Sequence, residues 1–268
     1  MSIEDILDGI DEKFFSELAD HGLVTIQTGI SDRDTILANL LRLSERLGGV
    51  IPHTEKQLFT DVTLKPEFND KSIIRPQSDN GPQAPHVDGV LSEETPTFLV
   101  MHCIHPSMIG GEPTYVDSRD VIDYILNEDY EFFAPLFQPD AVEIKRPNLK
   151  IKQRPVFRFS GDVLETYFSS HEYNTAKPTA KAAPAFDRLS NFIKDYKNQS
   201  TRKVSTGELT FSVNKRILHG RRAFTDMAGM ERHYVRAWYD GSRQNIPSQA
   251  KGLRLNGEQL LRVTSLAR

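Results

Sequence analysis

The chain has 268 residues, of which 38% are hydrophobic and 26% are charged, and its formal net charge is -4. This is the composition of a globular protein that can bury a sizeable core, and no repeat or linker divides it, so we expect residues 1–268 to form a single domain. The weakly acidic balance, without a basic stripe, excludes nucleic acid as an expected partner and mainly favours solubility.

The N-terminal part of the chain is predicted to be helical with one short strand. Apolar residues recur at helical spacing over residues 3–20, and residues 23–28 alternate as in a strand. Ser31 or Asp32 can cap a second helix, which the paired glycines beginning at Gly48 would stop.

The sequence also bears on where the protein acts. Its acidic first residues, Met1–Asp5, lack the basic start and apolar stretch of a secretory signal. No apolar run approaches the ~18 residues of a membrane span. We therefore expect a cytoplasmic protein with no membrane partner.

From about residue 55 onward, short strands and loops replace the helices. Residues 76–85 are rich in proline, glycine, asparagine and aspartate and are predicted to form a loop. Further strands are predicted at 97–105, 114–116, 155–159, 209–219 and 233–239, and helices at 118–136 and 180–197. This order favours a mainly β fold, a sandwich or jelly roll with flanking helices, over a doubly wound parallel sheet.

The only cysteine, Cys103, lies in the apolar run of residues 98–104. A cysteine in such a run usually acts as a small buried hydrophobe, and nothing nearby would activate a thiolate. We therefore do not expect a catalytic thiol. His102 and His105 lie in or just after the same run, where a core or surface role is favoured over metal binding.

The segment Pro85-His86-Val87-Asp88-Gly89 carries the first candidate chemistry. In an extended segment, residues two apart point to the same side, so His86 and Asp88 can converge on one cation. His219, which follows the strand-like residues 209–218, is the candidate for a second imidazole. Two histidines and one carboxylate leave coordination positions open and suit non-haem iron(II). On its own, however, an H-x-D pattern is weak support for a metal site.

Two arginines follow on a predicted strand. Arg232, Tyr234, Arg236 and Trp238 would share one face of it. Arginines that point into a protein are costly unless they meet anions, and a guanidinium matches a carboxylate. A dicarboxylate held next to iron is what 2-oxoglutarate chemistry requires. The open alternative is that Arg232 and Arg236 pair with surface acids.

Together, His86-x-Asp88, His219 and Arg232 resemble the taurine-dioxygenase-like (TauD/TfdA) group of Fe(II)/2-oxoglutarate oxygenases, over about residues 23–239. The spacing agrees, with roughly 130 residues from Asp88 to His219 and 13 more to Arg232. The residues that follow Asp88, as far as Cys103, are also partly similar to two branches of that group, the paerucumarin-type isonitrile oxygenases and carbapenem synthase.

The resemblance implies a double-stranded β-helix, a jelly roll related to cupins, with flanking α-helices. It implies that His86, Asp88 and His219 bind iron(II), and that Arg232 holds the distal carboxylate of 2-oxoglutarate. O2 would be the second cosubstrate, and succinate and CO2 the co-products. Members of the group often have a threonine after the paired glycines, at the position that is Pro113 in this chain. Thr114 is the candidate for that cosubstrate-binding role, provided that the strand bulges.

For the substrate, we expect a small carboxylate-bearing molecule, an amino acid or a derivative used in specialised metabolism. Arg236 should point into the same cavity as Arg232 and is the candidate for binding the substrate carboxylate, and Arg75 or Arg158 would assist. The related halogenases lack the metal-binding carboxylate, so Asp88 favours hydroxylation, desaturation or cyclisation.

Two other functions stay open at this point. One is a cupin-type metal enzyme that does not use 2-oxoglutarate, against which Arg232 and its spacing from His219 argue. The other is a non-enzymatic metabolite-binding barrel, against which the complete set of three ligands argues. The polar segment 168–174 is predicted to be either a lid or a plain surface loop, and the sequence does not indicate the oligomeric state.

Overall fold

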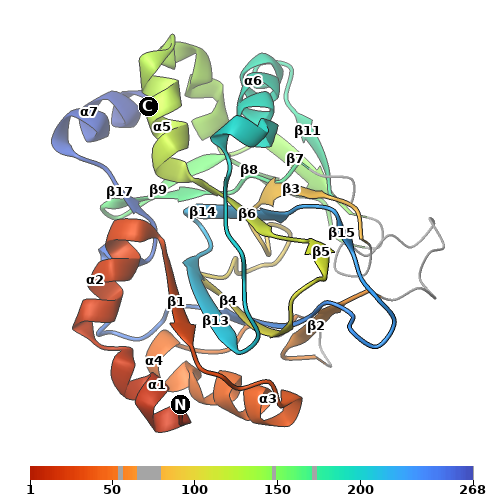
Figure 1. Cartoon of the computed structure of the whole chain (residues 1–268). Coiled ribbons are helices and arrows are strands. Elements are labelled where there is room, and N and C mark those ends of the chain that lie inside the picture. The colour runs from red at the N-terminus through yellow and green to blue at the C-terminus, as the bar shows by residue number, and fades with distance from the viewer. Residues whose placement is uncertain (54–56, 65–79, 147–148, 171–173, 268) are drawn as a thin grey trace.

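The computed structural model describes residues 1–53, 57–64, 80–146, 149–170 and 174–267. Figure 1 shows a mainly β molecule in which antiparallel strands are flanked by two groups of helices. This confirms the mainly β class with flanking helices that the sequence predicts.

The N-terminal helices differ in one respect from the prediction. The segment predicted as one helix contains two, α1 (Ile3–Gly9) and α2 (Glu12–His21), because the Asp11 carboxylate accepts a hydrogen bond from the Phe14 amide at 2.9 Å and caps a new helix. Asp32 caps α3 as expected. The next elements are β1 (Leu23–Gln27), α3 (Arg33–Arg42) and α4 (Ser44–Leu47).

The larger sheet has the strand order β1-β13-β4-β16-β2, and every neighbouring pair in it is antiparallel. Its other strands are β2 (Thr60–Thr63), β4 (Phe98–His105), β13 (Glu208–Val213) and β16 (His233–Tyr239). Alternate residues of β16 face opposite ways, as predicted. Val235, Ala237 and Tyr239 join the apolar cluster under α1–α4, and the remaining face is directed toward the second sheet.

The smaller sheet has the order β12-β6-β14-β3. Its strands are β3 (Gln83–His86), β6 (Pro113–Asp117), β12 (Ser200–Thr201) and β14 (Ile217–Arg221). Two predictions are corrected here. The single strand predicted at 209–219 is two strands, β13 and β14. The predicted loop at 76–85 ends in β3, because pairing with β14 gives this edge strand its hydrogen bonds; residues 76–79 lie outside the described part.

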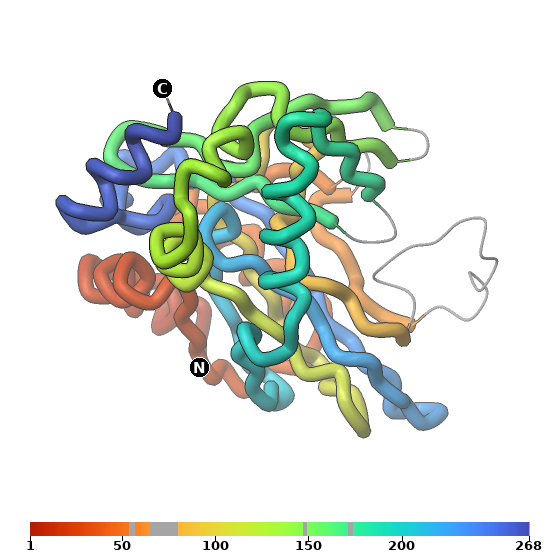
Figure 2. The backbone as a smooth tube through the Cα atoms, turned by 90° about the horizontal axis from the view of Figure 1, so that it is seen from above, coloured from red at the N-terminus to blue at the C-terminus, as the bar shows by residue number. Residues whose placement is uncertain are grey.

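Helices cover the outer face of the smaller sheet, above it in Figure 1 and in front of it in Figure 2. They are α5 (Ser118–Asn127), η3 (Tyr130–Phe137), α6 (Ala183–Lys194), η4 (Tyr196–Asn198) and, nearer the C-terminus, α7 (Gly257–Leu266). The short helix η5 (Ser248–Ala250) packs instead against α2. A second apolar cluster fills the space between this sheet and α5, η3, α6 and α7. Among the described helices, none is long and apolar enough to cross a bilayer.

Three short sheets complete the fold. They consist of β5 (Ile109–Gly110) with β15 (Phe224–Thr225); β7 (Val142–Lys145) with β8 (Lys152–Arg154) and β11 (Thr175–Pro178); and β9 (Phe157–Ser160) with β10 (Val163–Thr166) and β17 (Leu253–Arg254). The sheet of β7, β8 and β11 lies beside β3, and its loops contribute side chains to the site described next.

Candidate metal centre

The predicted metal ligands come together between the two sheets. Val87 is buried in the apolar cluster on the outer side of β3, so the residues on either side of it, His86 and Asp88, face inward. β14 places His219 directly opposite His86 in the β-sheet register. One potential ligand atom from each of these three residues lies within 4.8 Å of the other two.

The geometry leaves space between the donors. His86 Nε2 lies 3.4 Å from Asp88 Oδ1, His219 Nε2 lies 3.7 Å from Asp88 Oδ2, and the two imidazole rings are 4.5 Å apart. These separations exceed a usual hydrogen bond but match donors that share one ion, because a metal accepts each ligand at roughly 2.0–2.2 Å.

The histidines are suited to act as ligands. His86 Nδ1 lies 3.0 Å from the carbonyl oxygen of Ala84, which holds a proton on that nitrogen and directs the Nε2 lone pair toward Asp88. Burial lowers the pKa of His219 to about 3, so this imidazole is neutral at physiological pH. Metal binding requires neutral imidazoles.

Asp88 is held in its ionised form. Burial, the largest single influence, would raise its pKa, but Arg236 and the two histidines together outweigh burial and hold the pKa well below its ordinary value. Arg236 Nη1 donates to Asp88 Oδ2 at 2.8 Å, and Trp238 Nε1 donates to the same oxygen at 3.0 Å. Asn214 forms two hydrogen bonds with the main chain of Asp88. Its Oδ1 accepts from the Asp88 amide at 3.0 Å, and its Nδ2 donates to the Asp88 carbonyl oxygen at 3.1 Å.

Two imidazoles and one carboxylate, all largely buried, fit iron(II) better than the softer metals that thiolates bind. In the described part of the chain, no other group of three or more histidine, cysteine or acidic side chains converges in this way. Asn214 and Trp238 were not identified from the sequence. For Trp238, the sequence predicted that it shares a strand face with Arg236, which was a usable signal.

Arg232, immediately before β16, lies deeper between the sheets and is only 6% exposed. Its guanidinium stacks over the Tyr234 ring at 4.2 Å, and no carboxylate of the described residues lies within 4.0 Å of it. Burial lowers its pKa, yet a guanidinium stays charged. The site thus contains a buried cation that could bind a carboxylate group.

Thr114, the candidate for a second cosubstrate contact, lies on the other face of β6. The register pairs Thr114 with Gly220 and Tyr115 with His219, without a bulge in this stretch. A Cβ at Gly220 would come within 2.7 Å of the Thr114 hydroxyl, so these two residues pack together away from the metal ligands. The structure therefore brings Tyr115, and not Thr114, to the inner side.

Of the residues predicted to contact the substrate, the structure places one beside the metal ligands and another away from them. Arg236 does face the cavity, with Nη1 on Asp88 and Nη2 3.4 Å from His53 Nδ1. Arg158 instead pairs with Glu165, at 2.6 Å, and lies apart from the metal ligands. Arg75 lies outside the described residues. His53, which no pattern marked, also packs edge-on against Trp238.

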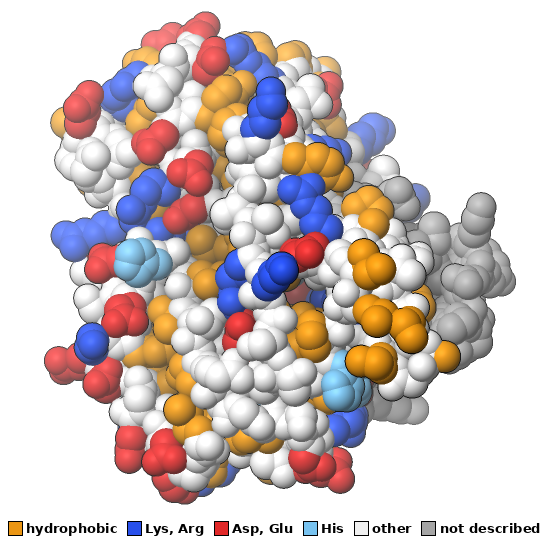
Figure 3. Space-filling view, in the orientation of Figure 1, with side chains coloured by type: hydrophobic (Ala, Val, Ile, Leu, Met, Phe, Trp, Pro, Cys, Tyr) orange, Lys and Arg blue, Asp and Glu red, His pale blue; other side chains and the backbone are white. Residues whose placement is uncertain are grey.

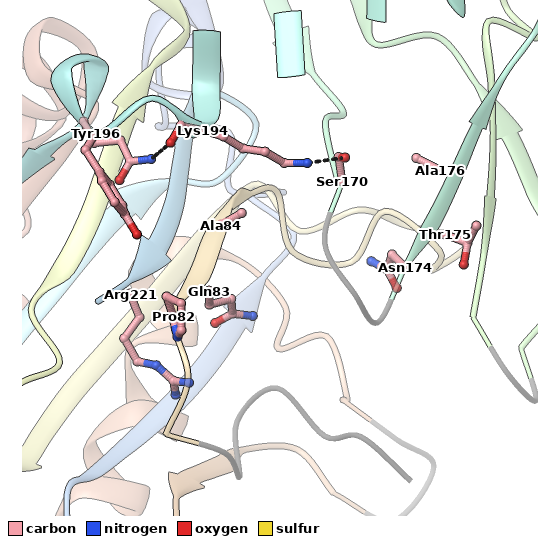
Figure 4. A pocket seen from close by; sticks show the side chains of 11 residues that line it. Pro82, Gln83, Ala84, Ser170, Asn174, Thr175, Ala176, Lys194, Tyr196 and Arg221 are labelled. Carbon is pink, nitrogen blue, oxygen red and sulfur yellow. Dashed lines mark hydrogen bonds between the residues drawn. The ribbon is translucent and has the colours of Figure 1, made fainter. Parts of the chain in front are cut away.

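A separate cavity of about 510 Å³ lies between the start of β3, the end of β14 and the end of α6 (Figure 4). Its lining includes two cations, Lys194 and Arg221, and no carboxylate from the described part of the chain. Lys194 points toward Ser170 and donates to its hydroxyl at 3.0 Å. This cavity also touches Asn174, one end of the segment that was predicted to be a lid or a loop; residues 171–173 of that segment lie outside the described residues.

The fold and these donors define a class, a mainly antiparallel β protein with a buried triad of two histidines and one aspartate and with arginines on an adjacent strand. The chain matches the family described as "Taurine catabolism dioxygenase TauD, TfdA family" over residues 3–238. It therefore belongs to the TauD/TfdA family.

Individual relatives are distant in sequence. Gamma-butyrobetaine dioxygenase of Homo sapiens is 23% identical over 90% of this chain, and the same enzyme of Pseudomonas sp. (strain AK-1) is 26% identical over 58%. The chain spans 63% of the length of the human relative.

Solved structures share the fold at low identity. OrfP, a non-heme iron oxygenase solved with Fe and alpha-ketoglutaric acid, gives a TM-score of 0.69 at 14% identity, covering 93% of this chain and 86% of its own. Asparagine oxygenase, solved with Fe(II), 2S,3S-3-hydroxyasparagine and succinate, gives 0.67 at 16%, covering 91% and 84%. PvcB of Pseudomonas aeruginosa gives 0.61 at 14%, covering 85% and 79%.

Proposed function

We propose that this protein is an Fe(II)- and 2-oxoglutarate-dependent dioxygenase that oxidises a small carboxylate-bearing molecule, an amino acid or a derivative. The observation that carries the proposal is the buried triad of His86, Asp88 and His219, whose donors lie within 4.8 Å of one another in a chain of the TauD/TfdA family. The two facing sheets would correspond to a double-stranded β-helix.

The roles of the residues follow from their positions. The triad would hold iron(II), and Arg232 would bind the distal carboxylate of 2-oxoglutarate, with the Tyr115 ring on the inner side of β6 nearby. When bound, iron(II) and 2-oxoglutarate together supply the activation of O2 for oxidising a C–H bond, with succinate and CO2 as co-products.

Asp88 has a second consequence in this proposal. Arg236 and Trp238 both donate to its Oδ2 and so leave Oδ1 directed toward His86 for the metal. An occupied carboxylate position favours hydroxylation, desaturation or cyclisation over halogenation. Arg236 Nη2, which lies 3.4 Å from His53 Nδ1, has a second N–H that would donate to a substrate carboxylate.

The relatives support the choice of an amino acid. Asparagine oxygenase was solved with 3-hydroxyasparagine and OrfP with (3S)-hydroxy-L-Arg. On the face seen in Figure 3, acidic and basic side chains are interspersed. The absence of a nucleic-acid partner stays a prediction. A single domain over residues 1–268, a cytoplasmic location and a role in specialised metabolism stay predictions.

The test is anaerobic reconstitution with iron(II) and 2-oxoglutarate. We expect a charge-transfer absorption band for the wild-type protein, none for His219→Ala, and succinate on exposure to O2 with a suitable substrate. Iron binding without any 2-oxoglutarate band would instead favour the cupin-type metal enzyme, and a lack of iron binding would favour a metabolite-binding barrel.

A further inference from the structure

Arg146, which no sequence pattern indicated, follows β7 and is held in a fixed position. Its Nε donates to Asn174 Oδ1 at 2.8 Å, and Asn174 Nδ2 donates to the Ser169 hydroxyl at 2.9 Å. Asn174 and Ser169 are both buried, with 4% and 1% exposure. A half-buried guanidinium is thus oriented through one nitrogen, and its two terminal nitrogens donate to none of the other described residues.

The segment that holds this guanidinium lies beside the metal ligands: the amide of Val87, between His86 and Asp88, donates to the carbonyl oxygen of Phe168, the neighbour of Ser169, at 2.8 Å. Burial lowers the pKa of Arg146. The positive charge of Arg236 lowers this pKa further, and the negative charge of Asp88 raises it. His53 lies in the same group: burial lowers its pKa to about 4, and the charges of Arg236, Asp88 and Arg146 all reach it. His53 Nδ1 lies 3.4 Å from Arg236 Nη2, so the segment at His53 and β16 meet beside the triad, and Arg146 is within electrostatic reach of both.

The charges of this group do not balance. In the described part of the chain, no carboxylate lies within 4.0 Å of Arg146, whereas the buried Arg216 pairs with Asp117 at 2.7 Å and the half-buried Arg202 pairs with Glu208. Arg146 and Arg236 together face one carboxylate, Asp88, whose charge the metal would also share. Uncompensated charge at a half-buried site is costly, and a bound anion removes that cost.

We propose that Arg146 is a specificity-determining residue that binds a second anionic group of the substrate. The substrate would then be a dicarboxylate, such as an acidic amino acid or its N-acyl derivative, with one carboxylate at Arg236 and the other at Arg146. This rests on the proposed function. A guanidinium fork favours a carboxylate over a carboxamide, because only the carboxylate gives two charge-assisted hydrogen bonds.

The experiment uses the anaerobic complex of the full chain with iron(II) and 2-oxoglutarate. The probes are acid and amide pairs: L-aspartate and L-asparagine, L-glutamate and L-glutamine, and N-acetyl-L-glutamate and N-acetyl-L-glutamine. Each probe is titrated against the charge-transfer band. We expect the acid of at least one pair to perturb the band at a concentration about ten- to a hundredfold lower than its amide, the usual value of a charge-assisted hydrogen bond.

In Arg146→Gln, the ratio of the amide concentration to the acid concentration that perturbs the band should fall to about one, and the titration with the amide should stay unchanged. Arg146→Lys should restore part of the preference for the acid, and Asn174→Ala should weaken it, because the guanidinium loses its support. The matched control is Lys145→Gln, which removes the same charge from an exposed neighbouring side chain and should keep the full preference. Each variant must first form the band with 2-oxoglutarate alone, which establishes that its site is folded.

Two results overturn the inference. One is a wild-type band that no acid perturbs at lower concentration than its amide, including the case in which no probe perturbs it. The other is an acid preference that persists in Arg146→Gln, or, if that variant does not fold, in Asn174→Ala. If the wild-type protein forms no band at all, the proposed function itself fails.

Discussion

Two clusters of aspartate, arginine and histidine lie on opposite faces of β16. In the outer cluster, Asp61 of β2 accepts hydrogen bonds from Arg33 Nε and Nη2, at 2.9 and 2.7 Å, and lies 2.8 Å from His233 Nε2. In the inner cluster, Asp88 lies 3.4 and 3.7 Å from two histidine nitrogens.

The two clusters also differ in exposure. The side chains of Asp61 and Arg33 are 23% and 46% exposed, whereas that of Asp88 is 8% exposed. In the outer cluster, Arg33 and His233 form hydrogen bonds directly with Asp61, so the cluster links the start of α3 to the larger sheet. In the inner cluster, imidazole nitrogens converge on a carboxylate without closing on it. The same residue types thus form a structural clamp where they touch and a ligand set where a common space separates them.

The largest expected effect comes from removing one ligand of the inner cluster. His219→Ala should abolish turnover and weaken iron(II) binding by more than about a hundredfold, because even outer-shell partners of a metal site contribute ten- to a hundredfold. Anaerobic iron titration and succinate formation measure the two effects. The same substitution in the outer cluster, His233→Ala, should leave both unchanged. Near-normal iron affinity in His219→Ala would show that the triad is assigned wrongly.

The second effect separates the cosubstrate from the metal. Arg232→Ala should raise the dissociation constant of 2-oxoglutarate by roughly ten- to a hundredfold, since a charge-assisted contact contributes about 1.5–3 kcal/mol. Iron binding should be retained. Titration of the charge-transfer band gives the constant, and Arg33→Ala in the outer cluster serves as the control. A 2-oxoglutarate titration that Arg232→Ala leaves unchanged would transfer the role to Arg236.

A smaller effect is expected from the support of Asp88. Trp238→Phe keeps an aromatic ring but removes the indole donor 3.0 Å from Asp88 Oδ2. Iron affinity should fall about tenfold, the lower end of the range for such partners. The variant should still form the 2-oxoglutarate band at saturating iron. If its iron affinity equals that of the wild type, Arg236 alone orients the carboxylate.

The clusters also show what a sequence can predict. The positions of His86, Asp88 and the β16 face follow from alternation along strands, which is a local property, and these predictions of position were met. The predicted role of Thr114 in cosubstrate binding required a β-bulge, and the pairing of β6 with β14 contains none.

What could not be predicted depends on contacts between distant segments. Asn214 lies 126 residues from Asp88, and His53 lies 183 residues from Arg236. Neither has a neighbouring motif, so only the packing of the sheets brings them to the site. Arg146 was missed for the same reason, because its role follows from Asn174 and Asp88 together.

The smallest effect is expected in the outer cluster and should appear in stability alone. Hydrogen bonds from Arg33, and then from His233, lower the pKa of Asp61 below its ordinary value. Because the folded-state pKa is the lower one, the carboxylate stabilises the protein fully above its unfolded pKa of about 3.9. This contribution is lost as the pH falls further, through the folded-state pKa.

Asp61→Asn should therefore lower the free energy of unfolding by about 1 kcal/mol at pH 7, as for a partly exposed ion pair, without changing turnover. The difference from the wild type should persist at pH 5 and shrink between pH 4 and pH 2, because protonation then removes the same charge from the wild type. Urea unfolding at these pH values measures it. Asp34→Asn is the control, since Asp34 is 93% exposed and lies 3.9 Å from the same arginine. If the loss in free energy of unfolding in Asp61→Asn stays constant down to pH 2, the carboxylate acts through its shape and not its charge. If Asp61→Asn loses turnover, the outer cluster contributes to the activity of the metal centre.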